Sequence, residues 1–142
     1  MSRIFWDSNL FIYLFENYGR HTAEVQKLRE QMILRQDELF TSTLTIGEVL
    51  TKPQSLGLTL ACEEYEEAIR STATVIDFGI AAARNYAKLR GQGSLKIPPA
   101  DAVQLACAAT AGIDLFLTND LRLHNVRVDG IHFITSVDRA PI

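Results

Sequence analysis

The sequence predicts a single α/β domain over residues 1–142, in which a central, mostly parallel five-stranded sheet is flanked by helices. Short β-rich apolar runs alternate with helical patterns along the whole chain, which is typical of a parallel sheet covered on both faces. A length of 142 residues is that of one domain. The 47% of hydrophobic and 22% of charged residues are ordinary values for a globular protein and exclude disordered and fibrous classes.

The first four elements are expected between residues 4 and 42. The apolar run 4–6 predicts the first strand. Helical patterns then predict one helix over residues 9–17 and a second over residues 21–36. The run 39–42 predicts the second strand, so the chain opens with a strand, two helices and another strand.

The next three elements are a short helix, a longer helix and a strand. The short helix is expected over residues 46–51, and Pro53 is expected to end it because proline lacks the backbone N–H of a helix interior. Residues 59–71 predict the longer helix. The β-rich run 74–78 predicts the third strand.

The last part of the chain continues the alternation. Residues 80–90 are expected to form a helix that stops at Gly91-Gln92-Gly93. An alanine-rich helix is expected over residues 99–111, and the apolar runs 115–117 and 131–134 predict the fourth and fifth strands.

Four acidic residues follow this pattern in a way that places them together. Asp7 comes directly after the first expected strand, and Glu48 lies in the short helix after the second. Asp101 is in the first turn of the helix that runs back into the fourth strand, and Asp120 follows that strand. Because ligands of parallel α/β sheets bind at the carboxyl ends of the strands, we expect all four carboxylates at one candidate site.

Each of these positions also has a purely structural explanation. Asp7 is suited to cap the helix that starts near residue 9. Thr45 and Glu48 have the spacing of a capping box. Asp101 is favoured near a helix N-terminus by the helix dipole, and Asp120 is suited to an Asx-turn. These explanations account for each position separately, but not for the shared edge.

A carboxylate cluster of this kind predicts a hard metal ion. Mutual repulsion raises the pKa of some of the carboxyls, and a bound cation relieves it. Carboxylate oxygens without histidine or cysteine favour Mg²⁺ or Mn²⁺ over zinc. The sequence has no glycine-rich phosphate-binding motif, which disfavours nucleoside triphosphate chemistry. Phosphodiester hydrolysis by an ion-activated water fits better.

The charge and the apolar pattern restrict the setting of this chemistry. Fourteen Lys and Arg against seventeen Asp and Glu give a net charge of −3, which argues against a protein that coats nucleic acid but not against a local nuclease site. No apolar run approaches the roughly 20 residues of a membrane span. Cys62 and Cys107 have no disulfide-framework or metal-site spacing. We therefore expect a cytoplasmic protein without membrane association.

Several other side chains have two readings that the sequence leaves open. The segment 10–15 is apolar nearly all round its helix, so it is either buried in the core or partly covered by a second chain. Three tyrosines either contact nucleic-acid bases or pack within the protein: Tyr13, Tyr18 and Tyr86. Four basic residues near the motifs either hold phosphates or are solvated surface charges: Lys52, Arg90, Lys96 and Arg122.

The segments around the four acidic residues resemble the four motifs of the PIN-domain family. The matching segments are Trp6-Asp7-Ser8-Asn9, Glu48-Val49-Leu50, the stretch PADAVQLA at 99–106, and Leu117-Thr118-Asn119-Asp120. The length of the chain and Thr51-Lys52-Pro53 after the second motif resemble the VapC-type toxin ribonucleases of toxin–antitoxin pairs.

This resemblance implies a PIN-like domain that acts as a metal-dependent endoribonuclease toxin. By the resemblance, Asp7, Glu48, Asp101 and Asp120 bind Mg²⁺ or Mn²⁺ and cleave RNA, while the hydroxyls of Ser8 and Thr118 support the acidic cluster. It also implies a homodimer and a cognate antitoxin, with transfer or ribosomal RNA as candidate substrates. For the antitoxin we expect a groove lined by Phe11, Tyr13, Leu14 or Phe15.

Two other functions compete with this hypothesis. One is a non-catalytic PIN-like module that binds RNA or protein. The other is a receiver-like signalling domain, whose acidic pocket also binds Mg²⁺ but takes up phosphate on one Asp. Residues 6–8, Trp-Asp-Ser, lack a second acidic residue directly beside Asp7, which argues against the receiver-like domain.

Overall fold

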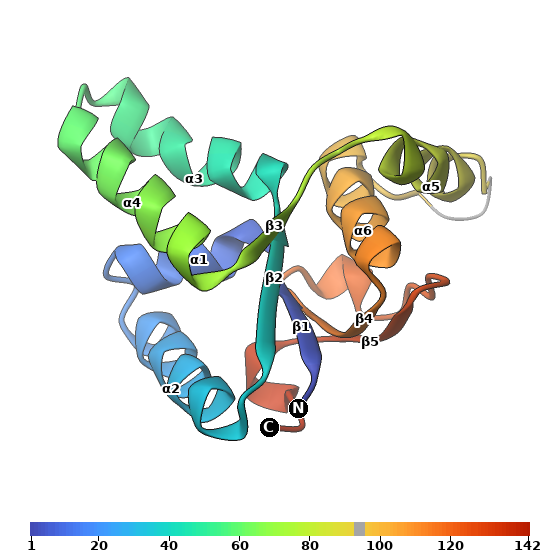
Figure 1. Ribbon diagram of the computed structural model, residues 1–142, viewed down its shortest axis with the longest axis horizontal. Helices are drawn as coiled ribbons and strands as arrows, with labels where there is room; N and C mark the ends of the chain where they lie inside the picture. The colour runs from blue at the N-terminus through green and yellow to red at the C-terminus, as the bar shows by residue number, and fades with distance from the viewer. Residues whose placement is uncertain (93–95) are drawn as a thin grey trace.

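The fold is an α/β sandwich around one parallel sheet, as predicted. The computed structural model describes residues 1–92 and 96–142 (Figure 1). Its five strands are all parallel and lie in the order β3-β2-β1-β4-β5, so that β1 is central. The elements are β1 (Arg3–Trp6), α1 (Ser8–Phe15), α2 (Arg20–Arg35), β2 (Glu38–Ser42), α3 (Thr43–Ser55), α4 (Thr59–Thr72), β3 (Thr74–Ile76), α5 (Ile80–Arg90), α6 (Pro99–Ala111), β4 (Ile113–Leu117), η1 (Leu121–Leu123), β5 (Ile131–Thr135) and η2 (Val137–Arg139).

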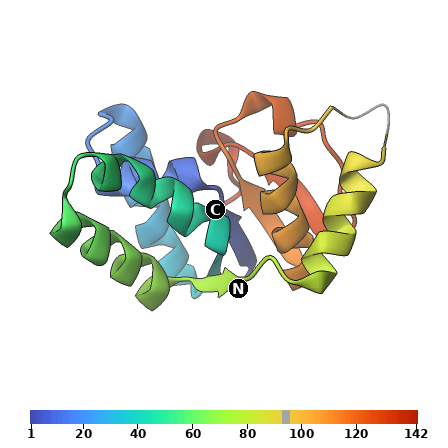
Figure 2. The same cartoon turned by 90° about the horizontal axis from the view of Figure 1, so that it is seen from above.

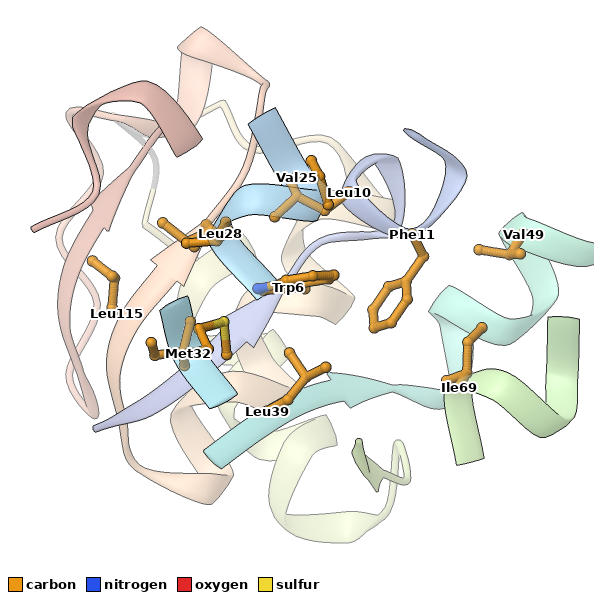
Figure 3. Close-up of a cluster of buried hydrophobic side chains, with 12 residues drawn as sticks. Trp6, Leu10, Phe11, Val25, Leu28, Met32, Leu39, Val49, Ile69 and Leu115 are labelled. Carbon is orange, nitrogen blue, oxygen red and sulfur yellow. The ribbon is translucent and has the colours of Figure 1, made fainter. Parts of the chain in front are cut away.

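Helices cover both faces of the sheet and give the domain two hydrophobic cores. Viewed from above, α1 to α4 lie on one side and α5 and α6 on the other (Figure 2). Because successive side chains of a strand point to opposite faces, Ile4 and Trp6 enter the first core and Phe5 the second. Trp6 lies at the middle of the first cluster (Figure 3). In the second, Phe5 stacks on Phe116 at 4.9 Å. The central strand β1 is thus fully enclosed.

The strand order excludes the receiver-like alternative. Domains of that class have the strand order 2-1-3-4-5. Here β2 and β3 lie on one side of β1, and β4 and β5 lie on the other. The receiver-like alternative is therefore wrong, because its strand order would place β3 next to β1.

The predicted helix over 46–51 was too short at both ends. Helix α3 begins at Thr43, directly after β2, and continues through Pro53 to Ser55. Proline removes one helical hydrogen bond, but here Pro53 is buried and lies near the end of the helix. The next amides still find acceptors, since Leu56 N donates to the Lys52 carbonyl. Pro53 therefore packs within the helix instead of ending it.

The other predicted elements are present with small boundary shifts. Strand β3 ends at Ile76, two residues before the predicted end, because its partner β2 ends at Ser42, which pairs with Ile76. Helix α5 ends at Arg90 as predicted, and its C-cap is Gly91. The last residue of the predicted Gly91-Gln92-Gly93 stop lies outside the described residues. In the described part of the chain, no helix has the length and apolar character needed to cross a membrane.

The apolar helix α1 is largely a core element. Leu10 and Phe11 are completely buried, so the expectation that Phe11 lines a partner groove was wrong. Tyr13, Leu14 and Phe15 are partly buried and pack against the first core cluster. The fold of the single chain thus covers one side of α1 and leaves these three side chains partly accessible.

Gly130 permits the close approach of β5 to α6. Its φ is +97°, and a Cβ atom there would lie 2.7 Å from the carbonyl oxygen of Ala109. Its own carbonyl accepts a hydrogen bond from Ile113 N at the start of β4. We expect Gly130→Ala to lower the free energy of unfolding by about 2 kcal/mol or more, through steric overlap and backbone strain. Urea unfolding measures this change.

Gly47→Ala is the matched control for this substitution. Gly47 lies within α3, and a Cβ there would meet no atom within 4 Å. Because glycine in a helix interior is unfavourable relative to alanine, this variant should be stabilised by about 0.5–1 kcal/mol. Equal unfolding curves for the two variants would contradict the assigned role of Gly130.

Candidate functional site

The acidic residues meet at the topological switch point of the sheet. The chain passes from β1 to β2 and β3 on one side, and then crosses to β4 on the other side of β1. Ligands of open α/β sheets bind beside the carboxyl ends of the strands at such a point. Asp7 directly follows β1, and its amide donates to the carbonyl of Leu117, the last residue of β4. Thr118 and Asp120 follow β4, which is the parallel neighbour of β1, and so lie at the same edge.

Asp7 is the most enclosed of the four carboxylates, with 6% of its surface exposed. Its Oδ1 accepts a hydrogen bond from Ser8 N at 2.8 Å, so it does cap α1. Its Oδ2 accepts one from the Thr118 hydroxyl at 2.7 Å. Burial raises the pKa of Asp7, the hydrogen bonds oppose this, and the charge of Asp120 raises it further. Asp7 therefore both caps α1 and lies at the acidic edge.

Glu48 faces Asp7 from α3 and is oriented by Ser8, whose hydroxyl donates to its Oε1 at 2.9 Å. Burial raises the pKa of Glu48, and the charge of Asp7 adds to this. The predicted capping box of Thr45 and Glu48 was wrong. The helix begins earlier, with Ser42 as its N-cap, so Glu48 lies beyond the first turn and its carboxylate is available to the acidic edge.

Asp101 and Asp120 share a cation supplied by the chain itself. Arg122 Nη2 lies 2.7 Å from Asp120 Oδ2 and 3.6 Å from Asp101 Oδ2. The hydrogen bond from Arg122 lowers the pKa of Asp120. Asp120 Oδ1 also accepts from Arg122 N, which is the predicted turn-closing role. Two of the other basic residues near the motifs contact different groups of the protein. Lys52 pairs with Glu16, and Arg90 donates to the Ile97 carbonyl.

The pKa of Asp101 is raised to about 6, first by burial and then by the charges of Asp120 and Asp7. Arg122 opposes this rise, and the charge of Glu48 contributes to it. Asp101 lies in the first turn of α6, where the helix dipole favours the ionised form. Desolvation and the neighbouring carboxylates outweigh that dipole. The charges of Asp7, Glu48 and Asp120 each act on Asp101, so the four carboxylates lie near one another at this edge of the sheet.

In this structure the four carboxylates do not have the geometry of a metal site. Over residues 1–92 and 96–142, no three His, Cys, Asp or Glu side chains are grouped closely enough to hold an ion as they stand. At the same edge, the Arg122 guanidinium engages Asp120 and approaches Asp101. The donor set consists of carboxylate and hydroxyl oxygens, which is the set that Mg²⁺ and Mn²⁺ prefer.

A buried polar network beneath the carboxylates was missed by sequence reasoning. Gln104 of α6 is 1% exposed, and its Nε2 donates to the Thr45 hydroxyl at 2.8 Å and approaches Asp7 Oδ1 at 3.4 Å. Its Oε1 accepts from Ser42. Thr41 lies 2.8 Å from Thr45 and donates to the Trp6 carbonyl. The available signal was a glutamine in the alanine-rich part of α6, three residues after Asp101.

The family of the chain follows from comparison of its sequence with family models. The PIN domain model matches residues 4–129, which contain all four acidic residues. The chain belongs to the PIN-domain family. The predicted resemblance is thereby confirmed, and the acidic edge is the carboxyl edge of a PIN domain. A comparison with curated protein sequences gives no match.

Solved structures share the fold of this PIN domain at low sequence identity. A chain of VapBC2 from Rickettsia felis, bound to a promoter DNA fragment, has a TM-score of 0.73 and 15% identity, covering 94% of this chain and 97% of that one. A chain of DNA-bound VapBC from Salmonella typhimurium gives 0.66 and 23%, covering 96% and 99%. VapC20 from Mycobacterium tuberculosis, described as a sarcin–ricin loop cleaving toxin, gives 0.63 and 15%, covering 80% and 86%.

The raised pKa values predict a pH-dependent stability of the metal-free PIN domain. Between the ordinary aspartate pKa of 3.8 and the folded value of about 6, Asp101 binds more protons in the native state than in the unfolded chain. The free energy of unfolding should therefore fall as pH rises through this window. Asp7 and Glu48, whose pKa values are also raised, act in the same direction. Urea unfolding between pH 4 and 7.5 with a chelator present measures this decline.

Asp101→Asn should remove part of the decline, because the amide does not ionise. Asp129→Asn, at an exposed position outside the cluster, should retain it. A wild-type profile in the Asp101→Asn variant would contradict the electrostatic account of this carboxylate.

Proposed function

We propose that this PIN domain is a metal-dependent endoribonuclease toxin that hydrolyses RNA phosphodiester bonds and is neutralised by a cognate antitoxin. The observation that carries the proposal is the convergence of Asp7, Glu48, Asp101 and Asp120 at the switch point, with pKa values raised in the first three. Perturbed carboxylates of this kind are typical of functional sites. Membership of the PIN-domain family supports the same conclusion.

The donor chemistry of the cluster fits Mg²⁺ or Mn²⁺. Asp7, Glu48, Asp101 and Asp120 are the residues that would hold the ion. Its charge would offset the burial and the neighbouring charges that together raise the pKa of Asp101. Arg122 must release Asp101 and Asp120 for both to serve as ligands. The ion supplies stabilisation of negative charge on the phosphate and activation of the attacking water.

The surrounding residues keep the carboxylates in place. Thr118 donates to Asp7 and accepts from Asp120 N at 3.0 Å, so one hydroxyl links the residues after β1 and β4. Ser8 holds Glu48, and its backbone amide holds Asp7. These contacts hold the carboxylates of Asp7 and Glu48 in place without help from a ligand. The proposed supporting role of Ser8 and Thr118 rests on these hydrogen bonds.

The proposed substrate is a folded RNA with an exposed loop, such as transfer or ribosomal RNA. A net charge of −3 provides few phosphate contacts, so affinity for RNA in general should be weak. Recognition then depends on the shape of an unpaired segment. The description of VapC20 as a sarcin–ricin loop cleaving toxin supports this substrate class.

Asp7→Asn tests the catalytic proposal against the alternative of a non-catalytic RNA- or protein-binding module. Asparagine keeps the size and the capping oxygen but loses the charge. Because a metal ion contributes several kcal/mol to phosphate chemistry, cleavage of a mixed RNA pool with Mn²⁺ should fall on the order of 100-fold or more. Chelation of the ion should abolish wild-type cleavage. Gel analysis of the RNA and a thermal melt without metal are the measurements.

Asp37→Asn is the control for a general effect of losing a buried carboxylate. Asp37 is 8% exposed and binds Ser2 N and Arg35 beside the start of β2, at the opposite end of the strands from the acidic edge. The Asp37→Asn substitution should lower the free energy of unfolding and leave RNA cleavage by the folded protein intact. Wild-type cleavage in Asp7→Asn, or an equal loss in Asp37→Asn, would refute the assignment.

The proposed protein partners are an antitoxin and a second copy of the chain. Tyr13, Leu14 and Phe15 of α1 are partly buried side chains suited to contact a partner helix, and Tyr13 accepts a hydrogen bond from Asn119 next to the acidic edge. The acidic cluster attracts a cationic side chain, as the chain's own Arg122 illustrates. The structural similarity to VapBC proteins supports an antitoxin, and the cytoplasm is the proposed setting.

Expression tests the partner proposal. We expect the wild-type chain to be toxic when expressed alone, and Asp7→Asn to be tolerated because it does not cleave RNA. The purified variant should be a dimer or larger by light scattering. It should also bind the small protein encoded next to its gene, and adding that protein to wild type should stop cleavage. A non-toxic monomer that does not bind this neighbour would overturn the proposal.

A further inference from the structure

Three aromatic side chains gather beside the acidic edge and form what we call the aromatic cluster, Tyr13, Tyr18 and His21. Tyr13 belongs to α1, Tyr18 to the connection after it, and His21 to the first turn of α2. The Tyr13 and His21 rings stack with centroids 4.8 Å apart and planes 15° apart. Tyr18 meets Tyr13 edge-on at 5.3 Å. Tyr18 thus packs edge-on against a ring that is itself stacked on His21.

The backbone that carries Tyr18 is fixed by hydrogen bonds. The Thr22 hydroxyl accepts a hydrogen bond from Tyr18 N at 2.8 Å and lies 2.7 Å from the Tyr13 carbonyl. Asn17 accepts from Gly19 N at 3.0 Å, where Gly19 has a φ of +61°. The connection is thus a built turn, and Tyr18 is held ready before any ligand arrives. A prearranged aromatic ring loses little conformational freedom when a ligand stacks on it.

The cluster is joined directly to the candidate metal site. Asn119 lies between Thr118 and Asp120, and its Nδ2 donates to the Tyr13 hydroxyl at 2.9 Å. On the same side, Lys52 of α3 lies 3.0 Å from Glu16. The hydrogen bond to Glu16 is the main cause of the raised pKa of Lys52, and the nearby Tyr18 contributes to it. An aromatic surface, a lysine and the acidic edge therefore adjoin one another.

The exposure of Tyr18 separates it from the tyrosines that serve packing. Its surface is 45% exposed although its ring packs edge-on against Tyr13. Tyr86, in contrast, meets Phe78 edge-on and packs against the second core cluster. Fixed aromatic rings beside cationic side chains are the means by which proteins bind unpaired nucleotides, because every base has a face that can stack. A lysine close to the aromatic cluster suits a phosphate chain better than an apolar peptide.

We propose that Tyr18, supported by Tyr13 and His21, is a stacking platform for one unpaired base of the RNA. The inference rests on the proposed ribonuclease function and adds a binding site to it. The base lies on the ring of Tyr18, and Lys52 exchanges its contact with Glu16 for the adjoining phosphate. A phosphodiester farther along the strand reaches the carboxylates. Paired RNA cannot present a base in this way, so the platform selects single-stranded or loop segments.

Tyr18→Ala should raise the KM for a single-stranded RNA about tenfold, with a smaller fall in kcat, as expected for the loss of one base–aromatic contact. Tyr18→Phe keeps the ring face and should retain the wild-type KM. The Kd of labelled single-stranded RNA should likewise rise in Tyr18→Ala and stay at the wild-type value in Tyr18→Phe. It is measured in the Asp7→Asn background so that the RNA is not cut. A thermal melt establishes that each variant is folded.

Phe133→Ala is the matched control, because Phe133 is an aromatic residue of the edge strand β5 that is 70% exposed. It should leave KM and Kd unchanged. Equal effects of Tyr18→Ala and Phe133→Ala, or an effect of Tyr18→Phe as large as that of alanine, would overturn the stacking proposal. Loss of antitoxin binding with unchanged RNA binding would assign Tyr18 to the protein partner and also overturn it. If wild type neither cleaves nor binds RNA, the ribonuclease function itself is wrong.

Discussion

The buried carboxylate of Asp7 is the constraint on which the rest of the site depends. It lies at the end of the central strand, where water is nearly excluded, so its charge has to be balanced by hydrogen bonds from the protein. Ser8, Thr118 and Gln104 supply them from α1, the end of β4 and α6. Satisfying this one carboxylate therefore fixes how three parts of the chain meet.

The remaining charges follow from the position of Asp7. Glu48 and Asp101 are brought close to it, and burial together with like charges raises the pKa of both. Arg122 offsets part of the repulsion, and its side chain is 69% exposed. The carboxylates at this edge therefore repel one another while all are ionised, and a divalent cation would reduce this repulsion. A fold keeps such a feature against its own stability where function requires it.

Helix α1 connects the core, the acidic edge and the aromatic cluster. Its N-cap is Asp7, its buried residues Leu10 and Phe11 anchor it to the first core, and Tyr13 reaches Asn119. One short helix therefore sets the relative positions of the carboxylates and of the proposed base platform. Because its two ends are tied to β1 and to the turn after residue 16, the distance between the two sites is fixed by the fold.

The sequence by itself determined the alternation of strands and helices, the parallel sheet and the convergence of Asp7, Glu48, Asp101 and Asp120, because these depend on local patterns and on the geometry common to parallel sheets. The extent of α3 was decided by the tertiary structure, which buries Pro53 and starts the helix at the end of β2. The contacts of Gln104 with Thr45, of Asn119 with Tyr13 and of Arg122 with Asp101 were also decided there. They join residues far apart in the chain, or side chains whose direction depends on packing, and no local pattern encodes either.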